Sequence, residues 1–304
     1  MKDGEDIMTE QIDLIQEAAE LLWSPDDERI KYIKTDKFIM YPKAESILLK
    51  MEDLLNEPKK SRMPCLLIIG DSHNGKTSLI KKFERLHLPT DGREEPTISI
   101  VFVQAPITPD PNGFYDAILD TILIPHRKGD SYTKKASEIK YHFESMGVKV
   151  LIVDEIHNIL SGSASKQRAF MNAVKNISNA LMLPIVLVGI KEALNATSTD
   201  MQISSRFRPM LLPLWRLNAD YASLLASIET MLPLRKLSKI STNSKIGRTI
   251  LELSEGLIGE IVSVISEAAI FGIRSGSEKI TEDVIKECGF IRPSLRRGLA
   301  LIDV

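Results

Sequence analysis

Cysteine is scarce in this sequence, which has only Cys65 and Cys288 in 304 residues. The two lie far apart, form no metal-binding or redox spacing and exclude a disulfide-stapled scaffold, so we expect a reducing compartment, the cytoplasm. Long apolar runs are also missing, because the longest, residues 181–190, has about half the length that crosses a bilayer. The first residues are acidic, so neither a secretory signal nor a membrane partner is expected.

Net charge is nearly absent as well, at −2, but it is unevenly distributed. Residues 1–30 hold ten carboxylates against Lys2 and Arg29, a charge of −8, which leaves +6 for residues 31–304. An acidic arm on a mildly basic body suggests a body that can meet an acidic partner. The simpler interpretation is the solvated face of an amphipathic helix over residues 12–22, and on charge alone we favour it.

The rest of the composition, 43% hydrophobic and 26% charged, is that of a globular protein with one or two domains. Short apolar runs bounded by breakers predict buried parallel strands. They are residues 64–70, 98–103, 148–153, 184–188 and, more weakly, 210–214. Helical patterns separate these runs, so we predict an α/β fold with a parallel sheet and helices on both faces.

After Leu217 the strand patterns stop. Helical periodicity continues over residues 218–232, 243–254, 257–274 and 281–288, which predicts a small all-helical second domain. We therefore expect four parts, which are an acidic helical arm (residues 1–60), an α/β core (61–217), a helical lid (218–290) and a basic tail (291–304).

A glycine-rich loop follows the first predicted strand and opens a helix. Its pattern is G-x-x-x-x-G-K-T, and the residues that we expect to bind nucleotide are Gly70, Asp71, Ser72, His73, Asn74, Gly75, Lys76, Thr77 and Ser78. Such a loop points backbone N–H groups at phosphate oxygens, and the helix start adds positive potential. Lys76 can reach the β- and γ-phosphates of ATP, and the Thr77 hydroxyl can bind Mg²⁺. A plain glycine turn is the alternative, and the flanking strand and helix argue against it.

The third predicted strand ends in two carboxylates, Asp154 and Glu155. The carboxyl end of a parallel strand is where an NTPase handles its metal and its attacking water. We expect Asp154 to hold Mg²⁺ and Glu155 to act as general base. The carboxylates alone are a moderate signal, and the phosphate loop upstream strengthens it.

Two further positions bear on the type of NTPase. A polar residue just after the fourth strand can touch the γ-phosphate, but here Ile190 stands there, followed by Lys191. Arg206, ahead of the last strand and at a predicted helix end, can reach a neighbouring subunit's nucleotide as an arginine finger, with Arg208 in reserve. An ordinary surface arginine is the alternative.

Together these motifs resemble an AAA+ ATPase with a helical lid, and more closely the TniB/TnsC-type ATPases of transposons. The resemblance runs from about residue 27 to residue 286. Beyond the ATPase motifs it rests on short segments that are more specific to the transposition branch. These are residues 41–44, 62–64, 103–106, 114–119, 154–158, 166–168, 202–207, 212–215, 232–234 and 254–259.

The resemblance implies an ATPase that binds ATP and Mg²⁺ and assembles into rings or helical filaments on double-stranded DNA. It further implies that such a homo-oligomer passes a chosen target to a transposase and meets a target-selector protein of the TniQ/TnsD type. Two departures concern the γ-phosphate: Ile190 replaces the expected Thr or Asn, and Glu260 stands where many lids carry an arginine. Both departures predict slow hydrolysis and a long-lived ATP state.

Two basic stretches are candidates for DNA contact, although no helix-turn-helix or zinc pattern occurs. The first, residues 126–135, mixes charge with hydroxyl and backbone donors, which suits sequence-independent phosphate contact. Its candidate residues, with one from the preceding loop, are Arg127, Lys128, Ser131, Lys134 and Asn112, and Lys135 adds to its charge. A plain exposed loop is an equal alternative. The second stretch, residues 235–248 in the lid, is better explained as a solvated face.

Two functions therefore remain open. The first is an ATP-gated, DNA-bound regulator of transposition, in which nucleotide state controls assembly. The second is a motor-type AAA+ enzyme, a DNA-loading factor or protein remodeller, with hydrolysis as its output. A P-loop signalling sensor would need large additional domains, for which we see no room in 304 residues.

Overall fold

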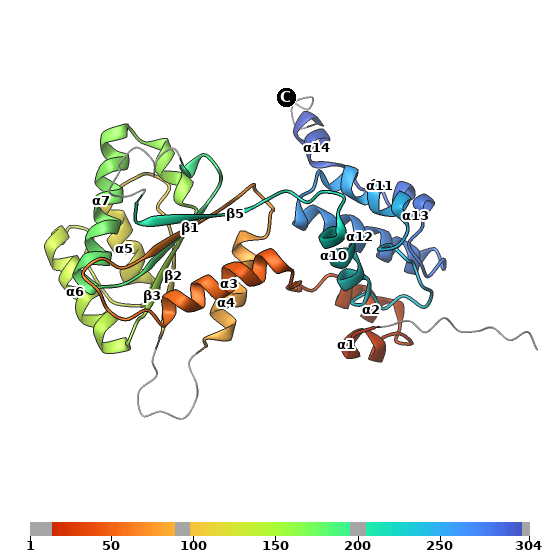
Figure 1. Cartoon of the computed structure of the whole chain (residues 1–304), viewed down its shortest axis with the longest axis horizontal. Coiled ribbons are helices and arrows are strands. Elements are labelled where there is room, and N and C mark those ends of the chain that lie inside the picture. The colour runs from red at the N-terminus through yellow and green to blue at the C-terminus, as the bar shows by residue number, and fades with distance from the viewer. Residues whose placement is uncertain (1–13, 89–97, 195–204, 300–304) are drawn as a thin grey trace, which may run out of the picture. The chain divides into compact units, whose positions relative to one another are not determined.

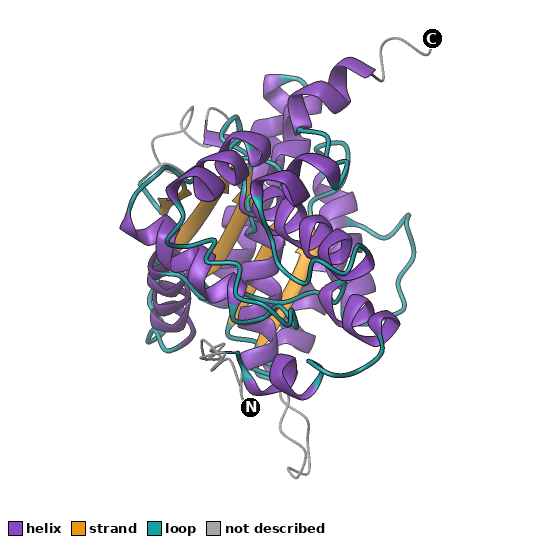
Figure 2. Cartoon of the chain, turned by 90° about the vertical axis from the view of Figure 1, so that its right-hand side faces the viewer, coloured by secondary structure: helices purple, strands orange, loops and turns teal. Residues whose placement is uncertain are grey.

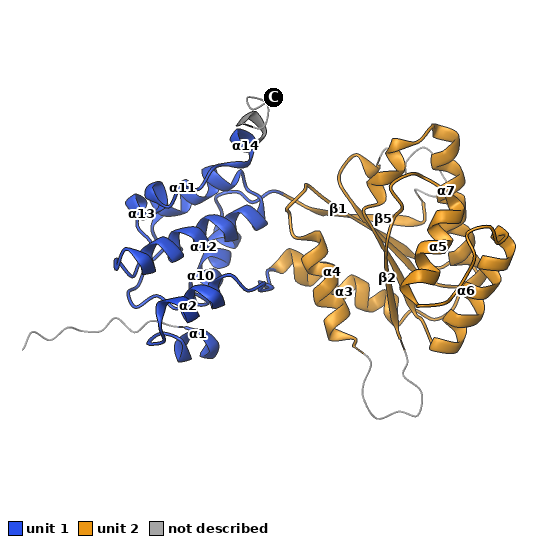
Figure 3. Cartoon of the chain, turned by 180° about the vertical axis from the view of Figure 1, so that it is seen from behind, with its two compact units in different colours: residues 1–41, 214–304 blue, residues 42–213 orange. Residues whose placement is uncertain are grey.

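The structure is a computed structural model that describes residues 14–88, 98–194 and 205–299. The described residues form two compact units, one from residues 42–213 and the other from residues up to 41 together with those from 214 onward (Figure 3). We call them the α/β unit and the helical unit. The helical unit is therefore built from two separate stretches of sequence.

The elements of both units are labelled in Figure 1. The α/β unit contains α3 (Pro42–Leu55), β1 (Cys65–Gly70), α4 (Lys76–Leu86), β2 (Ile100–Gln104), α5 (Pro111–Thr121), α6 (Tyr132–Met146), β3 (Val150–Asp154), the 3₁₀ helix η1 (Ile156–Ser161), α7 (Ala164–Leu181), β4 (Ile185–Gly189) and β5 (Phe207–Leu212). The helical unit contains α1 (Gln16–Glu20), α2 (Asp26–Ile33), α10 (Ala219–Glu229), α11 (Ser244–Ser254), α12 (Ile258–Arg274), α13 (Glu282–Glu287) and α14 (Pro293–Leu299).

The five strands form one parallel sheet in the order β2-β3-β4-β1-β5, drawn in orange in Figure 2. Ile69 pairs with Gly189 on one side of β1, and Gly70 pairs with Leu212 on the other. The carboxyl ends of the strands therefore lie at the same edge, where parallel sheets bind their ligands.

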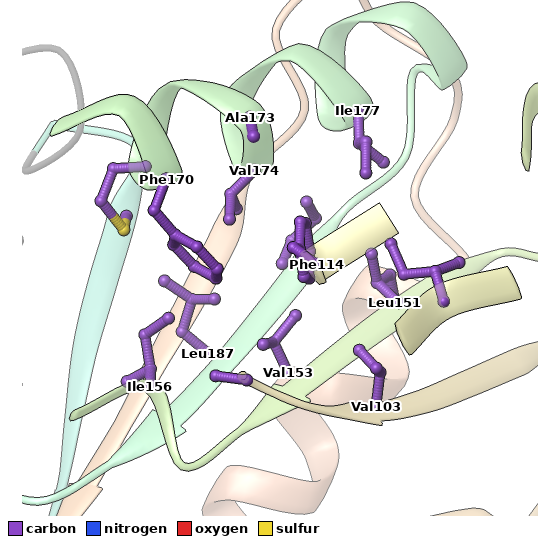
Figure 4. Close-up of a cluster of buried hydrophobic side chains, with 14 of the residues drawn as sticks. Val103, Phe114, Leu151, Val153, Ile156, Phe170, Ala173, Val174, Ile177 and Leu187 are labelled. Carbon is purple, nitrogen blue, oxygen red and sulfur yellow. The ribbon is translucent and has the colours of Figure 1, made fainter. Parts of the chain in front are cut away.

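The sheet is buried on both faces. Every residue of β1, β3 and β4 is buried, which explains why these strands read as continuous apolar runs rather than alternating ones. Helices α5, α6 and α7 cover one face, where Phe114 and Phe170 pack with Val153 and Leu187 (Figure 4). Helices α3 and α4 lie on the other face and contact β5 and β1, respectively (Figure 1).

The helical unit has a core of its own, and residues 26–33 belong to it. Helix α2 packs against α12, and the fully buried Arg29 side chain donates two hydrogen bonds of 2.8 Å to Glu278. The Arg29 guanidinium also donates to Asp26 (2.7 Å) and to the carbonyl of Pro233 (3.1 Å). This buried network fixes the segment before residue 42 to the lid helices.

The expected α/β fold with a helical second domain is confirmed. The boundaries differ from the expected ones, because the arm of residues 1–60 is split near residue 41: α2 joins the helical unit and α3 joins the α/β unit. The expected tail, residues 291–304, contains a helix, α14. The last strand also begins earlier than predicted, at Phe207, because it pairs with β1 from Cys65 onward.

Candidate nucleotide-binding site

The glycine-rich loop connects β1 to α4, and two residues fix its shape. Asn74, almost fully buried, donates from its amide nitrogen to the carbonyls of Leu212 (2.8 Å) and Pro213 (3.2 Å), which ties the loop to the end of β5. Gly75 has a φ of 79°, a left-handed conformation that suits glycine, and it begins α4. Backbone N–H groups at the start of α4 thus gather around the loop, as a phosphate site requires.

Lys76 bends back over this loop. Its ammonium group donates to the carbonyls of Gly70 (2.9 Å) and Asp71 (2.8 Å), and the residue is buried. Burial lowers the pKa of Lys76, although the nearby carboxylates of Glu155, Asp154 and Asp71 oppose that shift. A bound phosphate would give this ammonium group a stronger acceptor than two carbonyl oxygens.

Asp154 and Thr77 form the part of the site that suits a metal ion. The Thr77 hydroxyl donates to Oδ2 of Asp154 over 3.1 Å, and Oδ1 of the same carboxylate accepts from the backbone N–H of Glu155 at 2.8 Å. Asp154 is almost completely buried. A hydroxyl and a carboxylate beside a phosphate loop are the oxygen donors that Mg²⁺ prefers, so the residues present fit the expected ion.

Glu155 follows directly, with a left-handed backbone of φ 55° and ψ 34°. Its carboxylate is partly exposed, and Oε2 lies 3.1 Å from Nδ1 of His157. The turn is held closely against β4, because a Cβ on Gly189 would lie 2.7 Å from the side chain of Ile156. The backbone thus turns sharply where the buried strand ends, and it leaves the Glu155 carboxylate within reach of solvent.

Arg206 lies at the opposite edge of the sheet from the phosphate loop, at the amino ends of the strands. It directly precedes β5, whose first residue, Phe207, pairs with Cys65 at the start of β1, whereas the loop follows the end of β1. The five residue-to-residue steps along β1 separate Arg206 from the phosphate loop by about 17 Å. Arg206 donates to Oδ1 of Asn179 at 2.8 Å. The structure places Arg206 in a turn, and the residues that would form the expected helix end, 195–204, lie outside the described part of the chain.

The candidate DNA residues gather around the starts of α5 and α6. Arg127 and Lys128 are exposed in the loop before α6, and Ser131 caps that helix by accepting from the N–H of Lys134. Lys134 forms ion pairs with Asp130 (3.0 Å) and Glu138 (3.9 Å). Asn112 is exposed in the first turn of α5.

Lys135, which we expected to add to the charge of this basic segment, is fully buried instead. Its ammonium group lies 2.6 Å from Asp116 of α5, and Asp116 also lies 3.1 Å from Nε2 of His126. Asp116 therefore holds both ends of the segment, and Lys135 is a structural residue. The sequence spacing gives no signal of this pairing, because the two lysines of Lys134-Lys135 look alike in the chain.

Several contacts at or near the expected site residues were not predicted. They are the ion pair of Lys191 with Asp71, the contact of His157 with Glu155, the anchoring of Asn74 and, in the helical unit, an ion pair between Glu260 and Arg296 of α14. Only the strand order could have revealed the first, because it places the end of β4 beside the phosphate loop.

Several solved structures share the fold of this chain. Cdc6p from Pyrobaculum aerophilum matches with a TM-score of 0.58 and 16% identity over 87% of this chain and 70% of that one. The ORC2 protein of Aeropyrum pernix, solved in ADPNP–ADP complexes, matches with a TM-score of 0.57 and 16% identity over 85% and 70%. The Aeropyrum pernix ORC1 protein in complex with DNA gives 0.56 and 12% over 85% and 68%.

A sequence match identifies the family. Residues 29–217 match the family described as Bacterial TniB protein, so this chain belongs to the TniB family, and the resemblance seen in its motifs is confirmed. No curated protein sequence is significantly similar to the chain. Within the described residues, no helix has the length and apolar character that a bilayer crossing needs.

Proposed function

We propose that this chain is an ATP-dependent, DNA-binding regulator of DNA transposition that oligomerises on double-stranded target DNA. In this proposal it recruits and activates a transposase and receives its target from a TniQ/TnsD-type selector protein in the cytoplasm. The membership in the TniB family carries the proposal. The DNA complex of the similar ORC1 protein gives it support at the level of the fold class.

The residues of the phosphate loop have defined roles in this function. Backbone N–H groups of residues 70–78 and the ammonium group of Lys76 bind the β- and γ-phosphates of ATP. Thr77 and Asp154 hold Mg²⁺, which when bound neutralises charge on the phosphate oxygens. Glu155 accepts a proton from the attacking water as general base.

Arg206 acts in trans in this proposal. Its place at the amino ends of the strands separates it from its own chain's loop by the length of β1, so it can serve only a nucleotide bound by another copy. Hydrolysis then requires assembly, because each site is completed by its neighbour.

The test is electron microscopy of the full chain with duplex DNA and a non-hydrolysable ATP analogue. We expect rings or filaments on the duplex in the presence of the analogue, and none without nucleotide or with the Lys76→Ala variant. A closed ring that forms without DNA and hydrolyses ATP rapidly upon addition of a protein or DNA substrate would instead indicate a motor-type enzyme.

A further inference from the structure

An ion pair connects the phosphate loop to the chain that leaves β4. Strand β4 lies between β1 and β3, so the residues that follow β4 pass between the phosphate loop and the turn that carries Glu155. Because Ile69 pairs with Gly189, the residues two positions further on, Asp71 and Lys191, come to lie side by side. The Lys191 ammonium group is 2.9 Å from Oδ2 of Asp71.

Asp71 has two lysine partners. Its carbonyl accepts from Lys76, and its carboxylate accepts from Lys191. A carboxylate in a loop that binds phosphate repels the ligand, because like charges at short range disfavour each other. Lys191 neutralises that carboxylate. Both side chains are more than one third exposed, at 46% for Lys191 and 36% for Asp71, so their pairing is weak enough to exchange.

Among the residues that the structure describes directly after β4, 190–194, Lys191 alone has a side chain that can donate to a phosphate. Ile190 is apolar, and the other titratable groups that face this edge from the ends of β1 and β3 are His73, Lys76, Asp154, Glu155 and His157. Two of these side chains, Lys76 and Lys191, end in ammonium groups, and that of Lys76 donates to the loop carbonyls. Among the described residues named here, Lys191 is thus the second ammonium group at the carboxyl edge of the sheet, and a flexible four-carbon stem carries it.

We propose that Lys191 is the nucleotide-sensing residue of this chain, exchanging the Asp71 carboxylate for the terminal phosphate of a bound nucleoside triphosphate. The inference rests on the proposed ATP binding and deepens it. It predicts that the chain distinguishes a triphosphate from a diphosphate through Lys191, because a diphosphate does not provide the acceptor that displaces Asp71.

The test compares affinities for a fluorescent non-hydrolysable ATP analogue and fluorescent ADP, measured with the full chain at a dilution that keeps it monomeric. The variants are Lys191→Ala, Asp71→Asn and the double variant, with Lys149→Ala as a control. Lys149 is exposed just before β3, at the opposite edge of the sheet. We expect Lys191→Ala to weaken binding of the ATP analogue about tenfold while ADP binding changes little. Asp71→Asn should keep or strengthen binding of the analogue, and the control should match the wild type.

The double variant separates sensing from simple neutralisation. If Lys191 reads the phosphate, the double variant stays as weak for the ATP analogue as Lys191→Ala alone. If Lys191 only offsets the charge of Asp71, single Lys191→Ala weakens both nucleotides alike and the double variant recovers wild-type affinity, which overturns the inference. Failure of the wild-type chain to bind either nucleotide would contradict the proposed function itself.

Discussion

At the scale of single residues, the backbone at Glu155 is the unusual feature of the site. A non-glycine residue in the left-handed region carries roughly 1 kcal/mol or more of strain and persists where its surroundings hold it. Here the Asp154 carboxylate accepts from the Glu155 N–H at 2.8 Å, so the residue proposed to hold the metal ion also holds the turn of the residue proposed as general base. The positions of the two carboxylates are therefore coupled through the backbone.

The variants Lys76→Ala and Glu155→Gln should separate binding from hydrolysis. Lys76→Ala removes the ammonium group that the loop directs at phosphate, so we expect loss of ATP binding and, with it, of DNA binding. Glu155→Gln keeps the size of the side chain but cannot accept the proton. We expect normal ATP affinity, hydrolysis reduced about 10²-fold or more, and a longer-lived DNA-bound assembly. Nucleotide binding and phosphate release measure the two effects, and wild-type hydrolysis by Glu155→Gln would refute its role as the base.

The distance of Arg206 from its own phosphate loop predicts complementation between copies. We expect Arg206→Ala to reduce assembly-dependent hydrolysis about 10³-fold while monomer affinity for ATP stays close to that of the wild type. Mixing Arg206→Ala with Lys76→Ala should restore part of the activity, because a hybrid interface contains one intact site. An equal loss of ATP affinity in dilute monomer would show that Arg206 acts within its own chain.

At the scale of elements, the basic segment of residues 126–135 is held at both ends by Asp116, which contacts His126 and Lys135. Arg127 and Lys128 are exposed between these anchors, whereas the charge of Lys134 is shared with Asp130 and Glu138. We therefore expect the proposed DNA contact in this segment to depend mainly on Arg127 and Lys128.

We expect the double variant Arg127→Ala/Lys128→Ala to weaken binding to all duplexes alike and to lower the slope of log affinity against log salt by about 2, since each lost phosphate contact removes nearly one unit. Lys140→Ala is the matched control, because Lys140 is an exposed lysine within α6. The slope is measured by titrations at several salt concentrations with assembly checked in parallel. An unchanged slope would transfer the DNA contact to Lys236, Lys239 and Arg248 of the helical unit.

Local patterns predicted the elements well, because a buried parallel strand has a distinct sequence signature. The runs at residues 64–70 and 148–153 predicted β1 and β3, and the glycine-rich pattern predicted the turn from a strand into a helix that joins β1 to α4. The contacts that refine the site join residues far apart in the chain, such as Asp71 and Lys191. They depend on which strands are neighbours, and a single sequence does not contain the strand order.

At the scale of the whole molecule, the Arg29–Glu278 pair joins the two stretches that make the helical unit. Burial alone would raise the pKa of Glu278, but the hydrogen bonds from Arg29 and from the N–H of Arg235 outweigh it and the pKa is lowered. A lowered folded pKa contributes stability that is complete above the unfolded value of 4.5 and is lost as the pH falls through the lower, folded pKa.

We expect Arg29→Ala to reduce the free energy of unfolding of the helical unit by about 3 kcal/mol, because Glu278 stays buried with only Arg235 beside it. Urea unfolding followed by circular dichroism at pH 7 and pH 4 measures this loss, and it should be smaller at pH 4. Lys286→Ala is the control, since its pair with Asp283 lies in the same unit, is exposed and contributes within about 0.5 kcal/mol. Equal losses in both variants would exclude a structural role for the buried pair.

The order in which the two units can fold during synthesis follows from the split helical unit. Residues 42–213 are contiguous, so the α/β unit has its complete sequence before α10 is made. Helix α2 must wait through that whole stretch for α12 and Glu278, on the order of ten seconds at ordinary translation speeds. A nascent chain that has released residues 42–213 from the ribosome but still lacks α12 should thus carry a folded sheet and an unprotected amino-terminal segment, which a protease can remove until the last helices are synthesised.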